Sequence, residues 1–139
     1  MSGARKNGVF SLTIGLLTIL SNDTHYEEMK LLIAIIKDYR KVEDILMGFL
    51  EHDVSGATVI EAQGMGQILG NIPIFADNRG FFPGSAHDSY LIMSVVQASQ
   101  LNACQQVVEQ VCGPLTEPAS GIVFTLPVDT LLGLKSPLN

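Results

Sequence analysis

The sequence predicts an α+β domain with a ferredoxin-like architecture, in which two helices cover one face of a four-stranded antiparallel sheet. Three observations predict it. Four β-rich apolar segments and two segments of helical periodicity follow one another as β-α-β-β-α-β between residues 30 and 128. Each helical segment has a single apolar stripe. Gly or Pro residues mark the longer connections between the segments, as expected for turns and loops.

The first half of this pattern contains two strands and one helix. Residues 30–37 (KLLIAIIK) form a continuous apolar run, which is typical of a strand buried on both faces. Residues 38–53 predict a helix, because apolar residues recur at spacings of three and four. Gly56 ends the connection, and residues 57–63 predict the second strand. The apolar stripe of the helix consists of Val42, Ile45, Leu46, Phe49 and Leu50.

A long connection separates the two halves. Residues 64–87 contain five glycines and two prolines and predict a loop, and loops of this length are usually functional. Residues 88–98 predict the third strand. The second helix is expected to begin at Ser99 as N-cap and to end at Gly113. Its apolar residues are Leu101, Cys104, Val107, Val108, Val111 and Cys112.

The last elements follow a short loop at residues 114–120. Residues 121–128 predict the fourth strand, and residues 129–134 (DTLLGL) predict one further helical turn. No sequence signal divides this region, so residues 29–139 are expected to form one domain.

Residues 1–28 precede this domain as an extension. Residues 9–20 form an apolar run behind Arg5 and Lys6, too short for a bilayer span of about 20 residues. The run resembles the middle of a signal peptide, but no small-x-small cleavage site follows it. Three interpretations stay open: an added strand or helix, a weak export signal, or sequence upstream of a native start at Met29. We expect an extension that packs on the domain surface or on a neighbouring subunit.

The composition indicates which classes of partner and ligand are disfavoured. Apolar residues make up 47% of the chain and charged residues 16%, against a usual charged share of about 25%. This low share of charged residues indicates that more than one surface of the domain is buried, as in an obligate oligomer. The net charge is −6 and no basic run occurs, which argues against nucleic acids and anionic membranes as partners. A small anionic ligand stays compatible, because backbone amides can bind it.

Catalytic and metal chemistry is not indicated. Cys104 and Cys112 lie about 12 Å apart along one helix, too far for a disulfide. Free buried thiols in a reducing cytoplasm are expected. The paired carboxylates Glu43 and Asp44 are typical of a solvated helix face, and no nucleophile–base pair is evident, so we expect neither an enzyme nor a zinc site. The three histidines are scattered, at His25, His52 and His87.

Residues 56–67 read "GATVIEAQGMGQ" and residues 124–128 read "FTLPV". The first stretch is similar to a strand ending in G-x-T-[VI]-x-E-x-x-G-x-G, and the second to the last strand, of the PII family of nitrogen-regulatory signal proteins. The resemblance extends over residues 29–135. The matching positions are Gly56, Thr58, Val59, Glu61, Gly64 and Gly66.

The resemblance implies a cytoplasmic, non-enzymatic homotrimer that binds adenine nucleotides in the clefts between subunits. It also implies that the long loop, the T-loop at about residues 67–87, changes shape with the ligand and docks on a target protein, a transporter or an enzyme. The loop at about residues 115–121 corresponds to the family's B-loop.

The ligand-binding residues implied by the resemblance include two glycines that would let the chain approach a ribose and phosphates, Gly64 and Gly66. Thr58 corresponds to a position that faces the adenine, and Met65 would add apolar contact. The full set is Ile35, Gly56, Thr58, Gly64, Met65, Gly66, Gln67, Gly121 and Lys135.

The sequence departs from the family at the charged positions. Ile122 replaces the B-loop lysine, and the two arginines after the last strand correspond to Gly133 and Lys135. Each lost phosphate contact is worth about 1.5–3 kcal/mol. Gln67 and Ile68 replace a basic residue and the glutamine used around Mg²⁺. We therefore expect an AMP- or ADP-like ligand rather than ATP–Mg²⁺ with 2-oxoglutarate.

The T-loop departs as well, since it lacks the tyrosine that some members uridylylate. Its aromatic residues Phe81 and Phe82 are expected to anchor a partner, and Arg79 offers either a partner contact or a substitute phosphate contact. The alternative is that the aromatics pack on the trimer. Two other functions stay open: a nucleotide-independent interaction trimer whose cleft Ile122 fills, and a metal-responsive relative similar to divalent-cation tolerance proteins.

Overall fold

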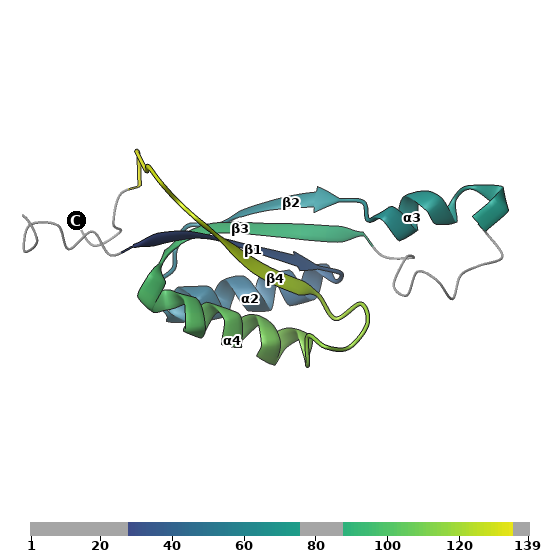
Figure 1. The fold of residues 1–139 in the computed structure, drawn as a ribbon. Helices are drawn as coiled ribbons and strands as arrows, with labels where there is room; N and C mark the ends of the chain where they lie inside the picture. The colour runs from purple at the N-terminus through teal and green to yellow at the C-terminus, as the bar shows by residue number, and fades with distance from the viewer. Residues whose placement is uncertain (1–27, 76–87, 135–139) are drawn as a thin grey trace, which may run out of the picture.

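The computed structural model describes residues 28–75 and 88–134, which form a four-stranded antiparallel sheet with two long helices packed on one face (Figure 1). The strand order β2-β3-β1-β4 confirms the predicted ferredoxin-like architecture. The described elements are β1 Met29–Ile36, α2 Tyr39–Glu51, β2 Thr58–Ala62, α3 Met65–Gly70, η1 Pro73–Phe75, β3 Ser89–Gln97, η3 Ala98–Gln100, α4 Leu101–Cys112 and β4 Ile122–Pro127.

The register of the sheet determines which side chains meet the helices. In the centre, β1 pairs with β3 and β4, so that Ala34 lies opposite Ile92 on one side and Val123 on the other. Because side chains alternate between the faces of a strand, Leu32 and Ile36 point the same way as Ala34. All three are fully buried, against α2 and α4.

The helices supply the other half of the core through their apolar stripes. The buried stripe residues are Val42, Ile45 and Phe49 in α2 and Cys104, Val107, Val108 and Cys112 in α4. Leu50 is an exception to the predicted stripe, because it lies at its edge and its side chain is 63% exposed. Both thiols are free, as expected, and burial raises the pKa of each.

The second helix begins differently from the prediction. Ser99 is not its N-cap, because Gln97 and Gln100 cap each other's backbone and start the 3-10 turn η3 ahead of α4. The backbone N–H of Gln97 donates to Gln100 Oε1 at 3.0 Å. Gly113 ends α4 as predicted, with a φ of 80° that favours glycine.

Two loop predictions also need correction. Residues 64–75 are not irregular, because the Gly64 carbonyl accepts from the N–H groups of Gln67 and Ile68, both at 3.1 Å, and starts α3. Residues 76–87 lie outside the described part of the chain. Residues 129–134 contain no helical turn, and Gly133 has a φ of 88° that is incompatible with one.

The sheet face opposite the helices is apolar, and no described element covers it. For this reason β1 is less buried on this face than on the helix-covered face: Leu31 and Ile35 are half-buried, and Ile33 between them is 9% exposed. We call this surface the open sheet face. Its apolar side chains are Leu31, Ile33 and Ile35 of β1, Ile60 of β2, Leu91, Met93 and Val95 of β3, and Ile122, Phe124 and Leu126 of β4.

Replacing Gly48 with alanine is expected to destabilise the fold by about 1–2 kcal/mol. A Cβ at Gly48 would lie 2.5 Å from Val107 Cγ1, at the contact between α2 and α4. Overpacking costs about 1–3 kcal/mol, and the higher helix propensity of alanine returns up to about 1 kcal/mol. Urea unfolding would measure the loss.

Gly70→Ala is the control, because a Cβ at Gly70 meets nothing within 4 Å. Combining Gly48→Ala with Val107→Ala should cost less than the two single changes added together, since the second removes the clashing methyl groups. Additive losses would show that this contact is not the cause.

Candidate ligand site at the base of the long loop

Three segments that are distant in sequence meet where β1 and β2 end and β3 begins. Lys37 follows β1, and its Nζ donates to Ser89 Oγ of β3 at 2.8 Å. Gly64, which follows β2, lies directly beside this pair. A Cβ at Gly64 would come within 3.2 Å of Lys37 Nζ and 3.7 Å of Ser89 Oγ. The missing side chain at Gly64 therefore gives the lysine ammonium access to the backbone at this point.

A second side-chain hydrogen bond joins the two ends of the long loop. Gln67 Nε2 donates to Asp88 Oδ1 at 2.7 Å. The carboxylate only accepts, so the amide orientation is determined, and Gln67 Oε1 faces inward. This oxygen is buried and has no hydrogen-bond partner among the described residues. A buried acceptor without a donor is costly, so the site offers one acceptor for a donor group from outside.

The charge on Lys37 is not neutralised within the described residues. Their ion pairs are Lys30–Glu28 and Arg40–Asp38, and neither involves Lys37. The Lys37 side chain is half-buried, and one of the three N–H donors of its ammonium binds Ser89. A partly desolvated ammonium without a carboxylate favours an anion, because the anion would compensate the charge.

Lys37 also lines a groove of about 520 Å³ beside this cluster. Asp38 in the groove is already bound to Arg40, whose hydrogen bond is the main cause that lowers the pKa of the carboxyl. With Lys37 and Lys41 against Asp88, the groove keeps an excess of one positive charge. It is lined by Lys37, Asp38, Tyr39, Arg40, Lys41, Asp88, Tyr90 and Ala119.

Two tyrosines form the apolar part of the groove. The rings of Tyr39 and Tyr90 meet edge to face, with centroids 5.4 Å apart. Burial, followed by the nearby Glu61 and Asp88 carboxylates, raises the pKa of the Tyr90 hydroxyl. The Tyr90 hydroxyl thus stays neutral at physiological pH, and both rings can contact a flat apolar group.

The short loop before β4 borders the groove through Ala119, which has a φ of 63°. Gly121 follows with a φ of 135°, and a Cβ there would lie 3.1 Å from the Ile35 carbonyl oxygen. Glycine is thus required at this position for backbone reasons. The structure brings the predicted residues Ile35 and Gly121 together at the same end of the sheet as Lys37.

Two predicted site residues lie elsewhere. Gly56 and Thr58 are at the start of β2, whereas Gly64 follows its end, and four strand steps from Thr58 to Ala62 span about 13 Å. The Gly56 carbonyl accepts from Ser94 Oγ at 2.6 Å. Met65 and Gly66 are the first residues of α3. Outside the described residues lie Lys135, Arg79, Phe81 and Phe82.

Sequence reasoning did not place Lys37, Ser89 and Asp88 in the site. The sequence pattern places Lys37 in the first predicted strand, residues 30–37, and Asp88 in the third, residues 88–98. The positions of these residues could have identified them. A polar residue that directly follows one strand and a polar residue that directly precedes its antiparallel neighbour lie at the same end of the sheet. The predicted architecture makes β1 and β3 neighbours, but it does not give the register that sets Lys37 against Ser89.

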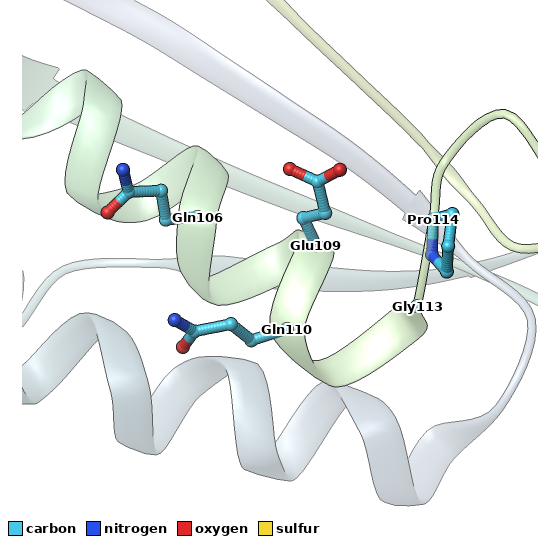
Figure 2. Close-up of a pocket in the computed structure, with 5 residues that line it drawn as sticks. All are labelled: Gln106, Glu109, Gln110, Gly113 and Pro114. Atoms are coloured by element: carbon cyan, nitrogen blue, oxygen red, sulfur yellow. The ribbon is translucent and has the colours of Figure 1, made fainter.

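A second groove, of about 550 Å³, lies at the C-terminal end of α4, beside Gly113 and Pro114. Figure 2 shows that Glu109 points away from Gln106 and Gln110, so the three side chains do not converge on a ligand. Within residues 28–75 and 88–134, no three His, Cys, Asp or Glu residues gather as a metal site. In the same residues no helix is long and apolar enough to cross a membrane.

The fold is that of PII proteins. The chain is similar to the crystal structure of Arabidopsis thaliana PII bound to citrate, with a TM-score of 0.52 and 16% sequence identity over 73% of this chain and 78% of that chain. No protein-family model matches the sequence, and no curated protein matches it. At this sequence identity the similarity establishes the fold, and a function has to be argued from the residues of the site.

Proposed function

We propose that this protein is a non-enzymatic, PII-like regulatory protein of the cytoplasm, which binds a small adenine nucleotide such as AMP or ADP between subunits and signals to a partner protein through the long loop. The observation that supports the proposal is the position of the Lys37 ammonium. This ammonium lies beside the bare backbone of Gly64, and no carboxylate of the described residues pairs with it.

Lys37 would take over the charge that the departures from the family remove. Ile122 and Gly133 stand where phosphate-binding cations are expected, and Ile122 is 53% exposed rather than packed into a filled cleft of its own chain. With its two remaining donor positions, the Lys37 ammonium would bind a phosphate oxygen. Gln67 Oε1 would accept from a hydroxyl or amino group of the same ligand.

The distances favour a site that two subunits share. Thr58 lies at one end of β2 and Gly64 follows the other end. One small nucleotide therefore does not reach both in a single chain, whereas it would reach Gly64 of one subunit and Thr58 of the next. The open sheet face supports association of copies, because it presents contiguous apolar side chains from all four strands.

Signalling would use the hydrogen bonds that join the loop ends. A ligand anion would compete with Ser89 for the Lys37 ammonium. A ligand donor would bind Gln67 Oε1, on the same side-chain amide whose nitrogen donates to Asp88. Both interactions act on the residues where the loop starts and ends. Apolar side chains on α3 and η1 offer a docking surface for a partner, with Ile74 77% exposed beside Met65, Ile68 and Ile72.

Isothermal titration calorimetry of the full chain with AMP, ADP, ATP and cyclic di-AMP tests the ligand. We expect AMP or ADP to bind and ATP–Mg²⁺ to gain nothing over ADP, since the cations for a third phosphate are missing. Heat from none of the four would contradict nucleotide binding. The nucleotide-independent interaction trimer would then be the better description, supported by the open sheet face alone.

Replacing Phe124 with aspartate is expected to convert the oligomer to monomer. Phe124 lies on β4 in the open sheet face, opposite Ile33 of β1. A charge buried there in each subunit would be unpaired and costly. Sedimentation velocity would report the change in mass. Leu50→Asp, on the exposed side of α2, is the control and should not change the mass; equal masses for all three proteins would exclude this face as the interface.

A further inference from the structure

A short apolar segment follows β4, and its leucines are exposed within the described part of the chain. Leu132 is 97% exposed, and Leu131 and Leu134 are exposed as well. We call residues 131–134 the leucine segment. Single exposed leucines are ordinary on protein surfaces, but three within four residues indicate a surface that another apolar element covers.

The chain enters β1 beside Val128, three residues before the leucine segment. The N–H of Val128 donates to the Met29 carbonyl at 3.3 Å, and the N–H of Ala98 donates to the Glu28 carbonyl at 2.8 Å. These bonds hold residue 28 at the end of the sheet where β4 stops. Figure 1 shows β1 beginning and β4 ending at the same end, opposite to α3.

We propose that residues 9–20 pack on the leucine segment of the same chain. Eight of these twelve residues are Val, Ile, Leu or Phe, and none is charged. Residues 21–28, which connect them to β1, reach up to about 27 Å when extended. Leu131 lies three residues beyond Val128, within about 11 Å of it, so the connection is long enough.

The tether makes the chain's own segment the favoured occupant. Because residues 21–28 span at most about 27 Å, they confine residues 9–20 to the neighbourhood of the leucine segment of the same chain, which raises their effective concentration there. This inference goes beyond the proposed function and needs neither the nucleotide nor the partner. It assigns residues 9–20 a structural role in covering the end of the sheet next to β4.

Cross-linking in the full chain tests the proposal. Leu16→Cys is combined with Leu132→Cys and treated with a short bismaleimide, and peptide mass spectrometry identifies the linked residues. The native thiols Cys104 and Cys112 are buried. We expect linkage within one chain at a rate at least tenfold above that of the control pair Leu16→Cys with Leu50→Cys. Leu50 is also exposed, at the end of α2.

Equal rates for the two pairs would overturn the proposal. Linkage between two differently tagged chains in a mixed sample would also overturn it, by showing that a second copy covers the leucine segment. Hydrogen exchange gives an independent readout without cysteines. Leu16→Asp with Leu17→Asp should speed exchange at residues 131–134, and unchanged exchange there would contradict the proposed contact.

Discussion

Replacing Lys37 with methionine is expected to weaken ADP binding about 10- to 100-fold. Methionine keeps much of the length and apolar stem of lysine but removes the ammonium that lies 2.8 Å from Ser89 Oγ and beside Gly64. A charge-assisted hydrogen bond to phosphate contributes about 1.5–3 kcal/mol, and each 1.4 kcal/mol is a factor of ten in affinity. Calorimetric titration of both proteins at one salt concentration measures the change.

The control for this experiment is Lys41→Met, which removes another cation from the same groove. Lys41 is not placed beside Gly64 by any described contact, so its loss should change affinity by no more than a few-fold through the general field of the groove. Lys37→Arg should retain part of the binding. If Lys37→Met binds ADP like the unaltered protein, or if Lys41→Met loses as much, the proposed phosphate contact is wrong.

Replacing Phe49 with alanine is expected to lower the free energy of unfolding by about 3–5 kcal/mol, the usual cost of deleting a large core side chain. Phe49 lies on α2 in the hydrophobic core, and it is the largest fully buried side chain, at 1% exposure. Alanine would leave a cavity between the helix layer and the sheet. Urea unfolding followed by circular dichroism, at one protein concentration, measures the loss.

Leu50→Ala is the matched control, since it removes a large apolar side chain from the next position of the same helix. Its side chain is 63% exposed, so we expect a loss of no more than about 1 kcal/mol. Comparable losses for Phe49→Ala and Leu50→Ala would mean that both faces of α2 are buried in the assembled protein. That outcome would change the assignment of the outer surface of α2.

Local pattern was sufficient to predict the fold. Continuous apolar runs marked β1 and β3, and spacings of three and four marked α2 and α4, because these periodicities reflect which side chains enter the core. The predicted helix starts were wrong where short-range hydrogen bonds determine the first turn. The reciprocal cap of Gln97 and Gln100 displaced Ser99, and the Gly64 carbonyl started a helix in a segment rich in glycine.

The sequence by itself determined the order of elements, the core stripes and the two glycines of the GxG pattern, since all of these depend on neighbouring residues. Only the tertiary structure decided the strand register, which pairs Ile36 of β1 with Tyr90 of β3. That register places Lys37 against Ser89 and Gly64, and it separates Gly56 and Thr58 from them. Register comes from packing between distant segments, so the lysine beside a bare glycine backbone becomes visible only in the folded chain.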